Sequence, residues 1–128
     1  MPNASPATSE RRTPEGAPVE AFERDFGDYI VNFVTFHPDM DQTPLMKGLP
    51  DNRCQCPHWG YVITGSFTYR CADHDETVQA GEAFYLPPGH VPVANAPDSV
   101  LVQFSPTDEL RKTEKVLFEN LKAMDSPT

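Results

Sequence analysis

The chain has 128 residues, the length of a single domain with a substantial core, and a formal net charge of -9. This charge argues against nucleic acids and anionic membrane surfaces as partners, because both recruit Lys and Arg. No apolar run approaches the roughly 20 residues of a membrane span, and no signal-peptide hydrophobic region opens the chain. The three cysteines, an odd number, are expected to be reduced thiols in a cytoplasmic protein.

Residues 1–20 are expected to form a flexible N-terminal tail. Four prolines lie there among Ser, Thr, Ala and Glu. Such a composition buries too little apolar surface to offset the entropy that is lost on ordering. We therefore expect the folded domain to begin at about residue 21.

Residues 26–36 are predicted to form a strand, because they are rich in aromatic and β-branched side chains. Apolar groups fall on both faces of this strand, with Tyr29 and Phe33 on one and Ile30 and Val34 on the other. One face is expected in the core, and the other is expected to be covered by a partner chain or by the tail. This pattern predicts a homodimer that pairs through the outer face of the sheet.

Residues 37–52 are predicted to form a loop that is interrupted by three prolines and a glycine. Leu45, Met46 and Leu49 are its apolar anchors. A loop of this length serves either as a lid over a binding site or as a packed cover over one end of the fold, and the sequence does not choose between them.

The stretch that follows carries Cys54, Cys56 and His58 at alternate positions. In an extended strand, alternate side chains point to the same face, so two thiols and an imidazole would point in one direction. Thiolate and imidazole are the ligands that zinc and related metals prefer. The alternative is that the cysteines are small buried hydrophobes and that His58 is a hydrogen-bonded core histidine. Three ligand types at this spacing favour a metal site.

The second half of the chain predicts several short strands and one helix. Strands are expected at residues 66–70, 83–86, 90–94 and 99–104, with turns at glycines and prolines between them. Ser105 and Pro106 are expected to open a helix that ends near residue 124, with an apolar stripe that packs on the strands. Many short strands with this punctuation predict an all-β barrel or sandwich.

Two stretches resemble the conserved motifs of the cupin superfamily. Residues 81–90, Gly-Glu-Ala-Phe-Tyr-Leu-Pro-Pro-Gly-His, resemble the start of its second motif, and residues 61–65, Tyr-Val-Ile-Thr-Gly, resemble the end of its first. The resemblance covers about residues 51–105. It implies an all-β, RmlC-like jelly-roll barrel (a double-stranded β-helix) at residues 21–105, a C-terminal helix at 106–124, and the pairing that is common among small cupins.

The metal motifs depart from the family pattern. The glutamate ligand of the family falls on His58, and Cys54 and Cys56 stand nearest to its His-x-His pair. Pro92 occupies the histidine position of the second motif, and His90 lies two residues earlier, on the same strand face. The expected metal site is therefore Cys54, Cys56, His58 and His90. A set without a carboxylate disfavours dioxygenase chemistry and favours zinc, although copper, iron and nickel also bind such ligands.

Two functions follow from this site. The first is a metalloenzyme that acts on a small organic molecule inside the barrel, with Trp59, Tyr61, Tyr85 and Phe104 as pocket walls and Tyr85 as the candidate catalytic proton donor. Its class, oxidoreductase, isomerase or lyase, stays open. The alternative is a non-catalytic binding or sensing module with a structural zinc, and a weaker third is a barrel without metal. Three protein ligands and a water favour the enzyme, whereas four protein ligands favour the structural site.

Overall fold

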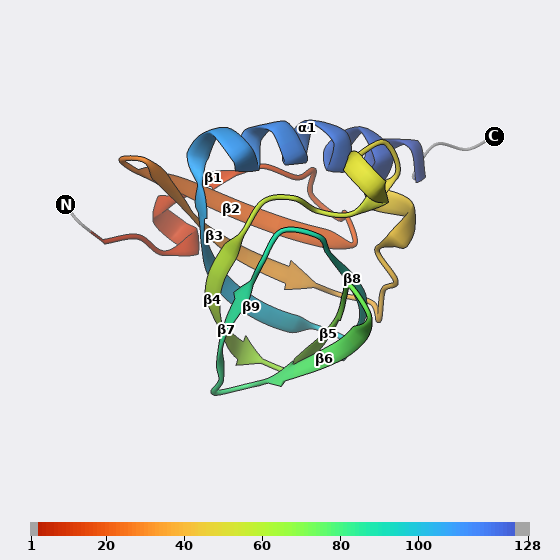
Figure 1. Cartoon of the computed structure of the whole chain (residues 1–128). Helices are drawn as coiled ribbons and strands as arrows, with labels where there is room; N and C mark the ends of the chain where they lie inside the picture. Colours follow the sequence, from red (N-terminus) through yellow and green to blue (C-terminus); the bar gives the residue numbers. More distant parts are fainter. Residues whose placement is uncertain (1–2, 125–128) are drawn as a thin grey trace.

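The computed structural model describes residues 3–124, which form two β-sheets and a C-terminal helix. The six-stranded sheet contains, in spatial order, β1 (Glu10–Arg11), β2 (Val19–Phe26), β3 (Tyr29–Phe36), β9 (Ser99–Pro106), β4 (His58–Thr64) and β7 (Ala83–Leu86). The three-stranded sheet contains β6 (His74–Gln79), β5 (Ser66–Cys71) and β8 (His90–Asn95). The two sheets curve around a common interior, as Figure 1 shows, so the expected all-β barrel is confirmed.

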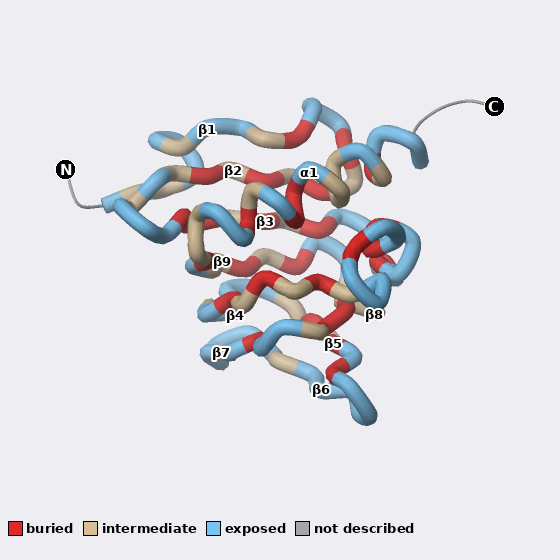
Figure 2. Tube along the Cα trace, turned by 45° about the horizontal axis from the view of Figure 1, so that its top comes forward, coloured by how far each residue is buried: buried red, intermediate tan, exposed pale blue. Residues whose placement is uncertain are grey.

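The barrel interior is filled by alternate side chains of the strands. Buried residues alternate with less buried ones along β2 and β5, whereas β3 has three consecutive buried residues at 30–32 (Figure 2). Val62, Phe67 and Leu101 are among the least exposed side chains, and they belong to one hydrophobic cluster that spans both sheets. Gly65, with a φ of 79°, turns the chain from β4 into β5, as its position after an apolar run predicts.

The strand that was predicted at residues 26–36 is two strands. Gly27 and Asp28 form a turn, so Phe26 ends β2 and Tyr29 begins β3. The sequence did not reveal β2 because one of its inward positions is Glu23, a charged residue with a 3% exposed surface. A buried carboxylate interrupts the alternation of apolar and polar residues by which a strand is recognised.

The N-terminal segment differs from the flexible tail that its composition predicts. Strand β1 pairs with β2, the backbone N–H of Arg12 donates to the Ala21 carbonyl at 2.8 Å, and the Ala21 N–H donates to Thr13 Oγ1 at 3.2 Å. Thr13 and Ala17 are buried. These backbone hydrogen bonds hold the segment along the edge of the sheet and depend little on apolar composition.

Helix α1 (Thr107–Met124) lies across one end of the barrel (Figure 1). It begins one residue later than the predicted start at residue 106, because Pro106 still belongs to β9, as does Ser105, the predicted N-cap. Leu110 and Leu121 are buried against the barrel. Within the described residues, no helix combines the length and the apolar character that a membrane crossing requires.

The loop at residues 37–52 packs between α1 and the barrel. It contains two short 3-10 helices, η2 (Thr43–Met46) and η3 (Pro50–Asn52). The Asn120 side-chain amide on α1 donates to the carbonyls of Leu45 and Lys47, both at 2.8 Å. Since its three apolar anchors are also buried, the loop is a packed cover.

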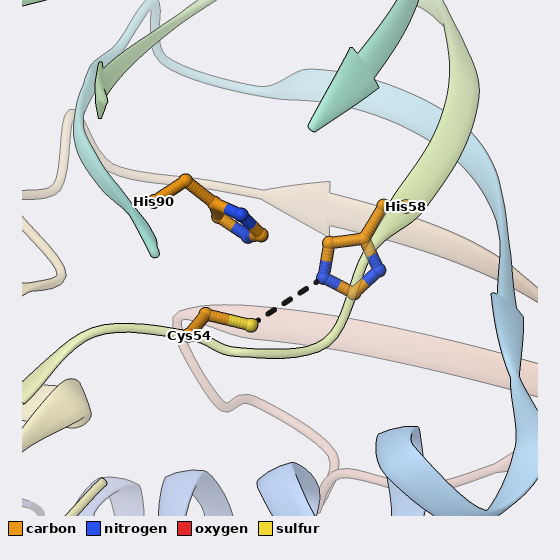
Figure 3. A group of neighbouring side chains, drawn as sticks. All are labelled: Cys54, His58 and His90. Carbon is orange, nitrogen blue, oxygen red and sulfur yellow. Dashed lines mark hydrogen bonds between the residues drawn. The ribbon is translucent and has the colours of Figure 1, made fainter. Parts of the chain in front are cut away.

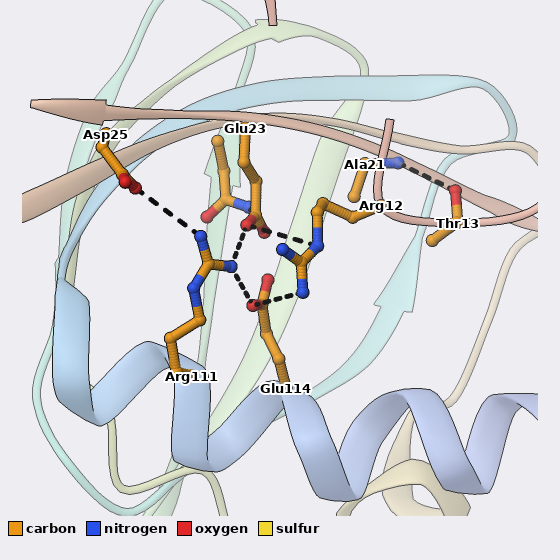
Figure 4. Close-up of polar contacts among 8 residues, drawn as sticks. Arg12, Thr13, Ala21, Glu23, Asp25, Arg111 and Glu114 are labelled. Carbon is orange, nitrogen blue, oxygen red and sulfur yellow. Dashed lines mark hydrogen bonds and ion pairs between the residues drawn. The ribbon is translucent and has the colours of Figure 1, made fainter. Parts of the chain in front are cut away.

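An ion cluster joins the sheet, the N-terminal segment and α1 (Figure 4). Arg111 on α1 donates to Glu23 Oε1 at 2.6 Å and to Glu114 Oε1 at 2.8 Å. The Arg12 guanidinium lies 3.9 Å from Glu23 and 3.8 Å from Glu114. Burial and the adjacent Glu23 carboxylate raise the pKa of Glu114. Two buried carboxylates therefore depend on two guanidinium groups for their charge balance.

Candidate metal centre

Cys54, His58 and His90 meet inside the barrel. Their Sγ and ring nitrogen atoms all lie within 4.8 Å of one another, and all three residues are buried. Figure 3 shows the three side chains pointing toward one another from two separate segments of the chain. The backbone sets this arrangement, since the Cys54 N–H donates to the His90 carbonyl at 2.9 Å and the Gly89 N–H donates to the Cys54 carbonyl at 2.8 Å.

Hydrogen bonds from the surrounding protein orient both imidazole rings. His90 Nδ1 lies 2.7 Å from the Pro87 carbonyl, so this nitrogen carries the proton and Nε2 keeps a free lone pair. His58 Nδ1 lies 2.6 Å from Ser105 Oγ, and its Nε2 lies 3.6 Å from Cys54 Sγ. Rings that are held through their far nitrogens are the usual arrangement of metal-binding histidines.

The sequence does not identify Ser105 as a partner of this group, because it predicts Ser105 as the N-cap of the C-terminal helix. The residue is fully buried in β9. The pairing of β4 with β9 places Trp59 opposite Phe104, and it therefore places His58 beside Ser105. This pairing joins segments far apart in the chain, so the local sequence carried no signal for it.

Burial keeps the three side chains uncharged. It lowers the pKa of His58 to about 3, with His90 as a second cause, and it lowers the pKa of His90. Burial also raises the pKa of the Cys54 thiol to about 11. At neutral pH both histidines therefore offer lone pairs, while coordination by Cys54 requires the loss of its thiol proton.

Cys56, the fourth predicted ligand, lies outside the group of three. It is buried, and its Sγ lies 3.5 Å from the Pro57 carbonyl. It packs in a cluster with Leu110 of α1, and burial raises its pKa to about 12. The predicted alternation requires a continuous strand, but β4 begins only at His58, after Pro57, which cannot donate to a strand ladder. The chain around Cys56 therefore does not follow strand geometry.

The four aromatic side chains that were predicted as pocket walls lie on the outer face of the six-stranded sheet. Trp59, Tyr61, Tyr85 and Phe104 are 42%, 46%, 52% and 39% exposed. Trp59 and Tyr85 stack with ring centroids 5.2 Å apart. Because His58 points into the barrel, its neighbour Trp59 points outward, and cross-strand pairing places Tyr85 beside it. The structure thus separates Tyr85, the candidate proton donor, from the three buried side chains.

The interior wall is made by other residues. A cavity of about 120 Å³ lies between the barrel and α1, and Cys54, His58 and His90 form part of its lining. Most of the remaining lining is apolar, with Asn32 and Gln42 among its polar side chains. Neither residue was predicted at the site, because polar side chains such as Asn32 in a strand and Gln42 in a loop are usually exposed to solvent.

No family model and no curated protein sequence matches the chain. Solved structures do match its fold. An RmlC-like cupin from Shewanella frigidimarina NCIMB 400 has a TM-score of 0.54 at 14% identity, covering 80% of this chain and 87% of that one. A variant of Bacillus subtilis oxalate decarboxylase has a TM-score of 0.56 at 16% identity, with 80% of this chain but only 28% of that chain covered.

A third similar structure is KdgF from Halomonas sp., with a TM-score of 0.50 at 22% identity, covering 75% of this chain and 86% of that one. All three identities are too low to transfer an activity, and they bear on the fold alone. Together with the two curved sheets and the C-terminal helix, they confirm the fold class that the two sequence motifs imply. The chain has the cupin fold, a jelly-roll barrel covered at one end by a C-terminal helix.

Proposed function

We propose that the protein binds one divalent metal ion per chain at Cys54, His58 and His90, with zinc favoured, and acts on a small organic molecule in the barrel cavity. The observation that carries this proposal is the convergence of three buried ligand atoms within 4.8 Å. With bonds of about 2.0–2.3 Å, the ligand atoms of a tetrahedral zinc lie about 3.3–3.8 Å apart. The Cys54–His58 separation of 3.6 Å already fits this range.

The number of ligands favours an enzyme over the alternative, a binding or sensing module with a structural zinc. Three protein ligands leave a fourth position free, as in catalytic zinc sites, whereas structural sites use four. The fourth would have to be Cys56, which lies outside the group. Copper, iron and nickel also accept sulfur and imidazole ligands, so the identity of the metal is a matter for elemental analysis.

When bound, such an ion supplies Lewis-acid polarisation or lowers the pKa of a coordinated water. The protein residues have separate tasks. Cys54 gives up its thiol proton on coordination, and the Pro87 carbonyl and Ser105 hydroxyl hold the rings of His90 and His58 in place. The mainly apolar cavity wall limits access of water to the reacting molecule.

Protein purified without chelators is expected to carry about one zinc-like ion per chain, because three uncharged, oriented ligands are already assembled. Elemental analysis measures this ratio, and absorption spectroscopy at the metal edge identifies the ligands. One sulfur, two nitrogens and one oxygen would support the enzyme, and two sulfurs the structural zinc. Less than about a tenth of an equivalent, with no tight binding on adding metal back, would contradict both.

We also propose that two copies pair through an aromatic face on the outside of the six-stranded sheet, formed by Tyr29, Trp59, Tyr61, Tyr85 and Phe104. All five side chains are exposed, and a continuous apolar patch of this kind usually marks an interface. The chain carries a net charge of -9, so most surfaces of two copies repel each other. The aromatic face consists of uncharged side chains, so two copies can meet there without bringing carboxylates together. A self-complementary sheet face suits a two-fold dimer.

Light scattering at micromolar concentration is expected to give twice the chain mass of 14.3 kDa. Trp59→Glu combined with Tyr85→Glu should give monomers, because two charges would be buried in the interface. Thr77→Glu, an exposed position on the three-stranded sheet, is the matched control and should stay dimeric. A mass near that of one chain for the unaltered protein would refute the pairing.

We further propose a cytoplasmic location and no nucleic-acid or membrane partner. The three cysteines are unpaired, which suits a reducing compartment. The net charge of -9 opposes binding to anionic polymers and surfaces. With nucleic acids and anionic membranes disfavoured, we propose a small molecule as the binding partner.

A further inference from the structure

Two buried polar atoms of the described residues have no hydrogen-bond partner, Asn32 Oδ1 and Gln42 Nε2. Their residues are only 4% and 5% exposed. Both residues line the cavity that holds Cys54, His58 and His90. An unpaired buried polar atom destabilises a protein, so native structures rarely keep one unless a ligand, a water or a reaction uses it.

The orientation of the Asn32 amide is fixed by its neighbour. Asn32 Nδ2 donates to Glu23 Oε2 at 2.6 Å, and Glu23 also accepts from Arg111. Glu23 thus accepts hydrogen bonds from a guanidinium and from the amide nitrogen, which places the nitrogen of the amide toward the carboxyl group and its oxygen away from it. Asn32 Oδ1 is therefore left as an acceptor on the cavity wall.

Gln42 approaches the cavity from another wall. Its backbone N–H donates to the Pro92 carbonyl of β8 at 2.9 Å, which fixes the covering loop against the three-stranded sheet. Asn32 lies in the middle of β3, in the six-stranded sheet. The cavity thus presents an unused donor, Gln42 Nε2, and an unused acceptor, Asn32 Oδ1, on separate elements.

The charge of the wall argues against an anionic occupant. Among the described residues, no Lys or Arg lines the cavity, whereas Glu114 does. Arg12 and Arg111 pair with the carboxylates of Glu23 and Glu114 instead. In the metal-free protein, an anion held by the amide pair would therefore lie near the Glu114 carboxyl group with no cation of its own.

The size of the cavity limits the occupant further. Its volume of about 120 Å³ is somewhat smaller than the cavity of about 150 Å³ that accommodates benzene, so it has room for at most about six non-hydrogen atoms. Val34, Leu86 and Leu101 are among the apolar side chains of the wall. The body of the occupant is therefore apolar, and its polar atoms are few.

We propose that the cavity binds an uncharged small organic molecule with an apolar body and a group that both donates and accepts hydrogen bonds, a primary amide or an alcohol. Gln42 Nε2 donates to it and Asn32 Oδ1 accepts from it. This inference rests on the proposed function, since it names the class of molecule that the same site acts on. Binding through the two amides does not itself require the metal ion, so the two proposals can fail separately.

Three probes of equal size, each with about six non-hydrogen atoms to match the cavity, test the inference: butanamide, butanoate and 2-pentanone. Calorimetry is done on the metal-loaded protein and on protein after metal removal. Butanamide is expected to bind at least about 10-fold more tightly than the other two in the metal-free protein, because butanoate is charged and the ketone has no donor. Butanoate binding best in that form, or no probe binding, would overturn the inference. The butanamide preference in a protein that binds no metal would retain it and refute the proposed metal site.

A variant separates recognition from structure. Gln42→Met keeps the length of the side chain and removes the donor, so butanamide affinity should fall about 10-fold while the melting temperature stays the same or rises. Gln79→Met, at an exposed position, is the matched control and should change neither. A Gln42→Met protein that binds butanamide as the parent does would overturn the inference, and the probe comparison on the parent protein decides the matter should this variant not fold.

Discussion

Replacing His90 by alanine is expected to lower the affinity for zinc by more than about 100-fold, because loss of a ligand exceeds the 10–100-fold effect of losing a residue that merely orients one. His90 is the proposed ligand that comes from the second motif, and it lies beside Cys54 and His58 in the buried group. A competition titration against a chromophoric chelator measures the affinity. His74→Ala, at an exposed histidine, is the control and should leave it unchanged.

Cys56→Ala tests which cysteine coordinates. Since Cys56 lies outside the buried group, its removal should leave both metal content and the metal-edge spectrum as they are. Cys54→Ala should remove the sulfur signal from the spectrum. An unchanged metal content and coordination sphere in the His90→Ala protein would show that His90 lies at the rim of the cavity and that the proposed site is wrong.

Replacing Arg111 by alanine is expected to lower the free energy of unfolding by about 3 kcal/mol, the lower end of the loss when one partner of a buried ion pair is removed, because the Arg111 side chain itself is 35% exposed. Arg111 contacts both Glu23 and Glu114, whose side chains are 1% and 6% exposed. Urea unfolding measures the change. Arg70→Ala breaks an exposed pair with Asp75 and should cost no more than about 1 kcal/mol.

A second substitution separates charge from packing in this cluster. Burial and Glu23 raise the pKa of Glu114, so its charged form is disfavoured and an uncharged amide should fit the same place. Glu114→Gln is therefore expected to restore part of the stability that Arg111→Ala removes. A double variant as unstable as Arg111→Ala alone would show that Arg111 stabilises the fold through the packing of its side chain and not through its charge.

The sequence predicted the fold better than the site. Glycine and proline punctuation and the two motifs were sufficient for the barrel, because they depend on short stretches of chain. The prediction that the aromatic side chains form pocket walls was wrong. Neighbouring residues of a strand point to opposite faces, so Trp59 points outward where His58 points into the barrel, and the motif alone does not specify which residues face inward. Cys56 does not lie with Cys54 and His58 because the predicted alternation of side chains requires a continuous strand, and Pro57 interrupts it.

Asn32, Gln42 and Ser105 could not be predicted as site residues from local sequence patterns. Asn32 and Gln42 become cavity residues only through the closure of the two sheets and the packing of the covering loop. Ser105 reaches His58 through the pairing of β9 with β4, across 47 residues of sequence. Periodicity reports which face of an element is buried, but it does not report which element lies opposite.

The position of β9 also has a consequence for how the chain folds as it is made. This strand lies between β3 and β4, so the six-stranded sheet cannot form until residues 99–106 have left the ribosome. Before that, β2 and β3 can pair locally, but one edge of β3 stays open to other chains. Pairing over such sequence separations is slow, and the nascent protein is therefore exposed to aggregation until β9 has emerged and paired.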